Sequence, residues 1–199
     1  MKKEQFLSYI KEKGKKHIIF DLDRTLCTLL IDWDPWIKEM NELFSSFGLT
    51  PEKGLDFNYA EIENLCIEKY GDKARGKILE INYRNEKEYF SGYDLFPVTM
   101  PLIELSQKQA DLYLWTSNDK QTITPVIKEM KISNFFKKII TRNDVKYIKP
   151  KIDGFVLIYD KKIPKSQYLL IGDSRSDSGA AINAGIDFLN IAEFKDFLA

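Results

Sequence analysis

Short apolar runs that end at polar residues recur along the sequence, and they constrain the fold more than any other feature. Runs of this length are typical of buried parallel strands. The predicted strands cover residues 17–20, 112–115, 138–140, 168–171 and 188–191. The predicted helices between them cover residues 123–130, 154–160 and 175–184. This alternation predicts a doubly wound α/β core with a Rossmann-like parallel sheet, which binds its ligands at the carboxyl ends of the strands.

A long segment after the first strand interrupts this alternation. Its apolar residues recur at three- and four-residue spacing, and we find no strand pattern between them. The predicted helices of this segment cover residues 36–47, 62–70 and 73–90. We therefore expect a helical insertion over residues 30–96, and a core domain formed by residues 1–29 and 97–199.

The charge balance argues against several classes of partner. The chain carries 30 basic and 30 acidic side chains, so its formal net charge is zero and no global positive field would draw it onto nucleic acid or anionic lipid. No apolar run approaches the length of a membrane-spanning helix. We expect a cytoplasmic protein that binds small ligands and neither nucleic acid nor a membrane; its oligomeric state stays open.

Histidine and cysteine are too scarce for several common kinds of site. His17 is the sole histidine, and the two cysteines, Cys27 and Cys66, lie in no CxxC or Cys/His cluster. A structural zinc site is therefore not expected, nor a histidine-based triad unless His17 itself supplies the base. The chemistry must come from carboxylates, hydroxyls, Lys or Arg.

A pair of carboxylates follows the first predicted strand directly. Asp21 and Asp23 stand two residues apart in the sequence DLDRT, so both side chains can face one pocket. Two ionised carboxylates this close repel each other, which favours a shared proton or a bound cation, and Mg²⁺ prefers such oxygen ligands together with phosphate oxygens. The first Asp could then attack phosphorus while the second handles protons. The pair alone is equally compatible with a turn or a helix cap.

Further polar groups follow the later strands. Thr116, Ser117 and Asn118 come after the second strand, where a hydroxyl and backbone N–H groups can hold phosphate oxygens. Lys149 follows the third strand, and its charge could neutralise both a nucleophile and a phosphoryl group.

The fourth strand leads into a second acidic motif. Asp173 and Asp177 are four residues apart at a helix start, so both carboxylates can face one cation. Small residues follow in the same helix and permit close packing of the helix on the sheet.

In this order, the motifs resemble the haloacid dehalogenase-like superfamily. The matching patterns are DxDxT, a strand-terminal Thr or Ser, a Lys-Pro pair and GDSxxDxxxAxxAG, and they cover residues 17–30 and 94–191. The resemblance implies that Asp21 is the nucleophile. It implies that Asp23 is the general acid and base, whose backbone carbonyl also faces a magnesium ion.

The resemblance also implies roles for the remaining site residues. Asp173 resembles a direct ligand of the magnesium ion, and Asp177 resembles an outer carboxylate of the same site. The residues implied to bind the phosphoryl group are Thr116, Ser117, Asn118 and Lys149. Arg24 stands where many members carry Gly, and it would place a charge near the entrance.

The helical insertion matches the position of the first type of cap domain in this superfamily, which closes over the site and selects the substrate. We call this segment the cap. Its candidate substrate contacts are Arg75, Tyr83, Arg84 and Lys87.

The expected activity is that of a magnesium-dependent phosphatase, which hydrolyses a small phosphorylated metabolite through an aspartyl-phosphate. Two alternatives stay open: a phosphotransferase or phosphomutase of the same superfamily, and a non-catalytic binding protein that has kept the fold. A carbon–halogen dehalogenase needs no second Asp for acid and base work on a phosphoester, so Asp23 argues against it. The substrate stays open among a sugar phosphate, a nucleotide, phosphoglycolate or another ester.

Overall fold

The computed structural model of the chain describes residues 1–49 and 58–199. Within them, the core is a five-stranded parallel sheet with the order β5-β4-β1-β6-β7. The strands are β1 (His17–Phe20), β4 (Asp111–Trp115), β5 (Phe136–Ile140), β6 (Tyr168–Gly172) and β7 (Asp187–Asn190). The predicted α/β class and parallel sheet are confirmed.

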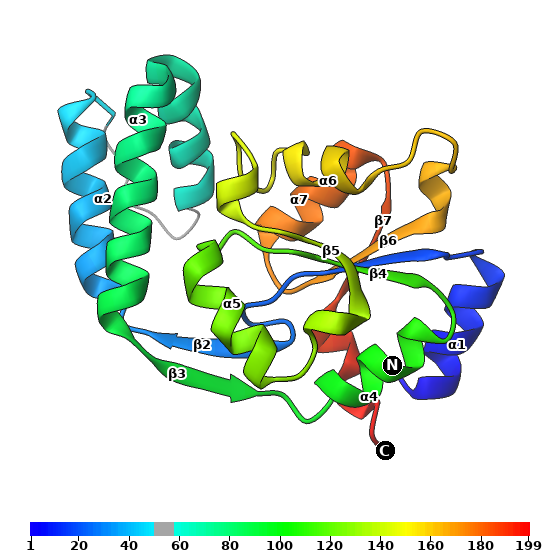
Figure 1. The fold of residues 1–199 in the computed structure, drawn as a ribbon. Coiled ribbons are helices and arrows are strands. Elements are labelled where there is room, and N and C mark those ends of the chain that lie inside the picture. The colour runs from blue at the N-terminus through cyan, green and yellow to red at the C-terminus, as the bar shows by residue number, and fades with distance from the viewer. Residues whose placement is uncertain (50–57) are drawn as a thin grey trace.

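Helices cover both faces of this sheet (Figure 1). One face carries α1 (Lys3–Glu12), α4 (Thr99–Gln107) and α5 (Lys120–Glu129), and the other carries α6 (Asp153–Ile158) and α7 (Arg175–Ala184). Short 3₁₀ segments complete the connections. Three of them are single turns, η1 (Ser133–Phe135), η2 (Arg142–Asp144) and η3 (Lys165–Gln167), and η4 (Ile191–Asp196) has six residues.

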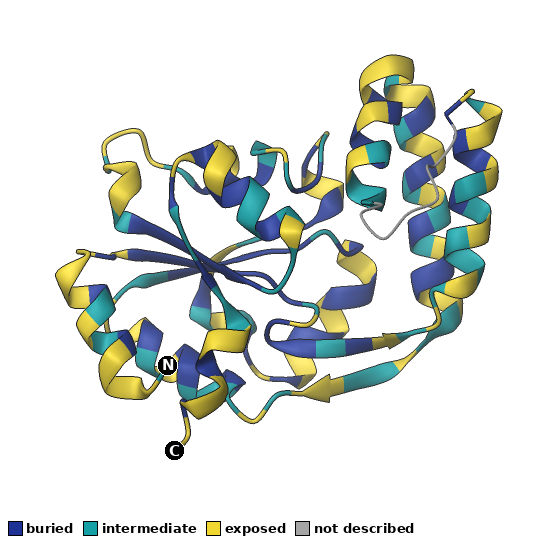
Figure 2. Cartoon of the chain, turned by 180° about the vertical axis from the view of Figure 1, so that it is seen from behind, coloured by how far each residue is buried: buried dark blue, intermediate teal, exposed yellow. Residues whose placement is uncertain are grey.

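The layers follow from the two-residue period of the strands. In β1, Ile18 and Phe20 pack with the first set of helices, whereas Ile19 packs with the second set. All four residues of β1 are buried, which is why a continuous apolar run encodes this strand. Figure 2 shows the buried strands at the centre and exposed residues on the outer surfaces of the helices.

The cap is built on two helices that lie side by side beyond the carboxyl end of β1 (Figure 1). They are α2 (Asp34–Ser46) and α3 (Tyr59–Tyr89). Gly71 in α3 has a φ of 66°, which interrupts the helical backbone between the two segments that the sequence predicts as separate helices. The two helices share an apolar cluster that includes Met40, Phe44 and Ile78.

The expectation that residues 30–96 hold no strand is wrong. β2 (Cys27–Ile31) and β3 (Phe90–Leu95) form an antiparallel pair that joins the cap to the core. β3 reads FSGYDL, and Gly and Asp are poor strand formers, so this strand forms because β2 supplies its hydrogen-bonding partner rather than through local preference. Gly92 adopts a φ of 145° next to the bulge at Leu30 and Ile31, a backbone region that favours glycine.

The order of the strands determines where a ligand can bind. From β1 the chain runs to β4 and β5 on one side, and then crosses to β6 and β7 on the other side. The crevice at such a reversal, outside the carboxyl ends of the strands, is the usual ligand site of an open α/β sheet.

Of the helices within the described residues, none is both long and apolar enough to cross a membrane.

Candidate active site

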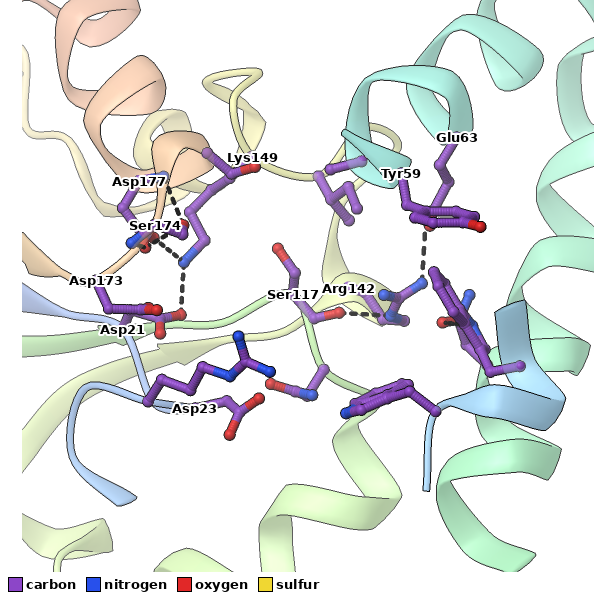
Figure 3. A pocket seen from close by; sticks show the side chains of 18 of the residues that line it. Asp21, Asp23, Tyr59, Glu63, Ser117, Arg142, Lys149, Asp173, Ser174 and Asp177 are labelled. Carbon is purple, nitrogen blue, oxygen red and sulfur yellow. Dashed lines mark hydrogen bonds and ion pairs between the residues drawn. The ribbon is translucent and has the colours of Figure 1, made fainter. Parts of the chain in front are cut away.

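A cavity of about 420 Å³ lies at this crevice, between the core and the cap. Its volume falls within the range of small-molecule sites. The core contributes charged and polar side chains from several strand ends, and the cap contributes mainly aromatic and polar side chains. Figure 3 shows Asp21, Asp173, Asp177 and Lys149 grouped on one side of the cavity, with Tyr59 on the other side.

Lys149 connects the carboxylates at the floor of the cavity. Its Nζ lies 2.6 Å from Oδ1 of Asp21 and 2.5 Å from Oδ1 of Asp177, and it donates a third hydrogen bond of 2.9 Å to the carbonyl oxygen of Trp115. Asp21 is 6% exposed and Lys149 is 2% exposed. The lysine therefore holds the carboxylate that follows β1 and the carboxylate in the first turn of α7 in one place.

Burial controls the protonation of these groups. Burial raises the pKa of Asp21 to about 8, against the opposing pull of Lys149. Burial also opposes the charge on Lys149, but the adjacent carboxylates of Asp177 and Asp21 outweigh it and raise the pKa of the ammonium group. Burial alone would raise the pKa of Asp177. The charge of Lys149 and the hydrogen bonds from Ser174 outweigh burial and lower this pKa. Further positive charge beside Asp21 would favour its ionised form.

The donor set of the site suits magnesium. One carboxylate oxygen from each of Asp21, Asp173 and Asp177 lies within 4.8 Å of the others. Burial first, and then the neighbouring carboxylate of Asp177, raise the pKa of Asp173. The positive charge of Lys149 therefore does not fully compensate the three carboxylates. Mg²⁺ favours a small number of carboxylates and keeps positions for water and phosphate oxygens. The carboxylate of Asp23 lies outside this group.

The position of Asp177 explains the spacing of the GDSxxD motif. Ser174 is the N-cap of α7, and its hydroxyl accepts a hydrogen bond from the backbone N–H of Asp177 at 3.1 Å. In return, the N–H and hydroxyl of Ser174 donate to Oδ2 of Asp177 at 3.0 and 2.5 Å. A Cβ on Gly172 would come within 2.5 Å of the Asp177 side chain, so only glycine fits at that strand end.

Asp23 lies at the side of the same cavity and is half-buried. The N–H of Leu29 donates to its Oδ1 at 2.8 Å. Burial raises the pKa of Asp23, which favours a carboxyl group that can release a proton to a leaving oxygen. Arg24, the next residue, is exposed at the cavity and has a φ of 60°, in the backbone region that a glycine would adopt most easily.

The turn after β4 differs from the expectation in one respect. Ser117 and Asn118 line the cavity, whereas Thr116 is 1% exposed and is absent from the lining. The Thr116 hydroxyl donates to Oδ1 of Asn118 at 2.7 Å and accepts from the backbone N–H of Asn118 at 3.2 Å. Thr116 thus shapes the turn that presents the two residues after it.

The cap residues expected to contact substrate lie elsewhere. Those absent from the cavity lining are Arg75, Tyr83, Arg84 and Lys87. Arg75 donates to the carbonyl oxygen of Val145 at 2.9 Å, Arg84 pairs with Glu39, and Lys87 lies over the Tyr83 ring. The side chains of Arg75 and Arg84 are thus engaged in structural contacts, and substrate contact by these four residues stays a prediction.

The cap instead contributes residues that the sequence analysis did not identify. Trp33, Trp36, Tyr59 and Glu63 line the cavity, and Arg142 joins them from the end of β5. Nη1 of Arg142 lies 3.1 Å from Oε1 of Glu63, and both side chains are buried. Nε of Arg142 also donates to the carbonyl oxygen of Ser117 at 2.5 Å. The position of Arg142, directly after a predicted strand and Thr141, was the one available signal.

Replacing Gly172 tests this arrangement. We expect Gly172→Ala to force Asp177 away from Lys149 and to lower the free energy of unfolding by about 1–3 kcal/mol, as overpacking of a filled site does. Urea denaturation followed by circular dichroism measures the change. Gly76→Ala is the matched control, because a Cβ at this exposed helical position meets nothing within 4 Å and alanine favours the helix. Equal stability of Gly172→Ala and the wild type would contradict the close approach of Gly172 and Asp177.

Several known proteins resemble this chain in sequence. Several curated relatives are phosphoglycolate phosphatases, among them the following two. The one from Photorhabdus laumondii is 28% identical over 188 residues, which are 87% of this chain and 78% of the relative. The one from Escherichia coli K12 is 30% identical over 128 residues, which are 63% of this chain and 47% of the relative. The chain spans 52% of a further relative, the Bacillus subtilis protein YfnB, at 31% identity over 125 residues that cover 61% of this chain.

Solved structures share the fold. A protein from Bacteroides fragilis, described as a haloacid dehalogenase-like hydrolase, has a TM-score of 0.62 at 21% identity, and the match covers 87% of this chain and 86% of that one. The sequence also matches the haloacid dehalogenase-like hydrolase family over residues 18–191. Since this match spans most of the chain and includes every motif of the site, the chain belongs to the haloacid dehalogenase-like hydrolase family.

Proposed function

We propose that the chain is a magnesium-dependent phosphatase, which hydrolyses a small phosphorylated metabolite through a phosphoryl intermediate on Asp21. The observation that carries the proposal is the pairing of buried Asp21 with Lys149 at 2.6 Å, next to further carboxylates in a ligand-sized cavity. Two relatives named as phosphatases support the reaction type. Magnesium is supported by the oxygen donor set and by the structure of YfnB, described as bound to magnesium, which has a TM-score of 0.50 at 19% identity and covers 87% of this chain and 85% of that one.

In the first half of the reaction, an oxygen of Asp21 attacks phosphorus and forms an acyl phosphate, while the ester oxygen leaves. Asp23 gives its proton to that oxygen, which its raised pKa favours. Lys149 stays charged beside both the nucleophile and the phosphoryl oxygens. Ser117 and Asn118 lie at the cavity wall, where they can position the phosphoryl group.

In the second half, Asp23 takes a proton from a water molecule that attacks the phosphorus of the acyl phosphate. The bond between phosphorus and the Asp21 oxygen breaks, inorganic phosphate leaves, and the Asp21 carboxylate is restored. The carboxylates of Asp21, Asp173 and Asp177, with the backbone carbonyl of Asp23, would hold the magnesium ion. When bound, this ion supplies positive charge that offsets the repulsion between the carboxylates and an anionic substrate.

Asp21→Asn should lose turnover by a factor on the order of 10³ or more, because the amide keeps the shape of the side chain but cannot attack phosphorus. The measurement is phosphate release from p-nitrophenyl phosphate with magnesium present. Asp94→Asn, at an exposed position of β3, is the matched control and should retain wild-type activity. Appreciable phosphatase activity in a folded Asp21→Asn preparation would rule out Asp21 as the nucleophile.

Asp173→Ala should weaken magnesium binding by about 10-fold to 100-fold, with partial recovery of activity at high magnesium because Asp21 and Asp177 still offer oxygen ligands. Isothermal titration calorimetry measures the binding directly, and Asp94→Ala serves as the control. Excess chelator should stop turnover of the wild type, and added magnesium should restore it. Full activity in chelator, or unchanged magnesium binding by Asp173→Ala, would place the metal elsewhere.

A further inference from the structure

We propose that Asn64 of the cap is a positioning residue for phosphoryl transfer, which acts by holding the backbone next to Lys149. Asn64 lies in α3, outside the described lining of the cavity, so it can act on the reaction only through another residue. It contacts Ile148, the residue directly before Lys149 in the sequence. The inference rests on the phosphatase function proposed above and adds to the site a residue that none of its sequence motifs contains.

Both polar groups of the Asn64 amide bond to the backbone of Ile148. Oδ1 accepts a hydrogen bond from the Ile148 N–H at 3.0 Å, and Nδ2 donates to the Ile148 carbonyl oxygen at 2.9 Å. Asn64 is 2% exposed, so water competes little for these bonds. Two bonds of opposite direction to one residue fix both the position and the orientation of its peptide groups, as a neighbouring strand does in a sheet.

The segment that carries Ile148 receives no support from regular structure. Residues 145–152 lie between η2 and α6 and belong to no helix or strand. Buried backbone groups in such a segment need partners from side chains or turns. Ile148 is buried, and its carbonyl oxygen also accepts a hydrogen bond from the N–H of Lys151 at 3.0 Å, which closes a turn around Lys149. Asn64 therefore anchors the first residue of the turn that presents Lys149.

The position of this turn matters because the Lys149 ammonium group uses all of its donors. An ammonium group has three N–H donors, and those of Lys149 meet Asp21 at 2.6 Å, Asp177 at 2.5 Å and the Trp115 carbonyl oxygen at 2.9 Å. A backbone displacement of about 1 Å would lengthen these contacts. Misplacement of this size can cost an enzyme about 100-fold in rate.

The preceding cap residue holds a second core loop of the site. Glu63 pairs with Arg142 at 3.1 Å, and Arg142 donates to the Ser117 carbonyl oxygen at 2.5 Å (Figure 3). Ser117 and Lys149 are both proposed to contact the phosphoryl group. Two consecutive residues of α3 thus tie the loops that carry them to the position of the cap.

Lysine NMR measures the effect on Lys149 without any substrate. The protein is labelled with ¹⁵N-lysine, and the ammonium resonance of Lys149 is assigned by its loss in Lys149→Met. Asn64→Ala should shift this resonance, or broaden it through faster exchange with water, because the turn is no longer held. Lys15, the other buried lysine among the described residues, precedes β1 at the opposite end of the sheet and is the internal reference. An unchanged Lys149 resonance in folded Asn64→Ala would overturn the proposal.

The kinetic test uses p-nitrophenyl phosphate with saturating magnesium. Asn64→Ala should lower kcat by about 10-fold to 100-fold and should change KM by less than about 3-fold, because the reacting groups are misplaced while the substrate still binds. Asn85→Ala is the matched control and should keep the wild-type kcat. Asn85 is also a buried amide of α3, but its bonds to Ile81 and Glu39 stay within the cap. Wild-type kcat in folded Asn64→Ala, or an equal loss in Asn85→Ala, would overturn the proposal.

A variant of similar shape separates the hydrogen bonds from packing. Leucine keeps the branched shape of asparagine but offers neither a donor nor an acceptor, so Asn64→Leu should lose as much kcat as Asn64→Ala. Recovery of the wild-type kcat in Asn64→Leu would attribute the effect to the filling of space and overturn the proposal.

Hydrogen exchange of the wild-type protein decides the matter if neither variant folds. Relative to their unfolded-chain rates, the Ile148 N–H should exchange at least about 10-fold more slowly than the N–H of Lys146, an exposed residue of the same segment. Equal relative rates would show that Asn64 does not hold the turn and would overturn the proposal.

Two results separate this inference from the proposed function. Phosphate release from no phosphomonoester would overturn the phosphatase function, and lysine NMR would then decide whether Asn64 positions Lys149. Wild-type phosphatase activity together with an unchanged Lys149 resonance in Asn64→Ala would overturn the inference while the phosphatase function stands.

Discussion

The ion pairs of Lys149 with Asp21 and Asp177 are the interaction on which the rest of the site depends. Removing a charge from water costs several kcal/mol in a protein, and these groups are almost entirely buried. The cost is offset because each group has its partners: Lys149 contacts two carboxylates and a carbonyl, and Asp177 also receives hydrogen bonds from Ser174. The absence of a side chain at Gly172 leaves the space that this packing requires.

A second buried polar network joins the cap to the core. Glu86 of α3 is fully buried and accepts two hydrogen bonds from the backbone N–H of Asp119, at 3.0 and 3.2 Å. Burial raises the pKa of Glu86 to about 7, while Arg142 opposes that shift. With the Glu63–Arg142 pair, these contacts fix the cap over the carboxyl ends of the strands. On the cap side the cavity is therefore bounded by polar contacts as well as by aromatic rings, and the buried charges at its floor interact more strongly than they would in water.

Local sequence pattern was enough to predict the sheet and the floor of the site. The strands are buried apolar runs, and polar residues after parallel strands meet at one edge whatever lies between them, so Asp21, Lys149 and Asp173 could be placed together. β2 and β3 could not be predicted in the same way, because their pairing partners are about 60 residues apart and β3 has weak strand preference. The helix α4 was not predicted either, since it is short and has Pro101 in its first turn.

The cap side of the site was harder to predict because tertiary contacts decide which side chains reach the cavity. Arg75 and Arg84 resembled substrate contacts by charge alone, but a backbone carbonyl and Glu39 occupy them. Trp36 fitted the apolar period of a helix, so its place at the cavity edge was not visible in the pattern. A buried pair such as Glu63 and Arg142, 79 residues apart, leaves no local signal at all.

The most direct test of the account is chemical trapping of the phosphoryl group. The protein is mixed with a phosphomonoester and magnesium, quenched, and reduced with borohydride, which converts an aspartyl-phosphate to homoserine; peptide mass spectrometry then locates the modified residue. The account predicts homoserine at position 21, because Asp21 is the carboxylate that Lys149 holds at the end of β1. Homoserine at position 23 or 173 in place of position 21, or turnover without any reducible intermediate, would contradict it.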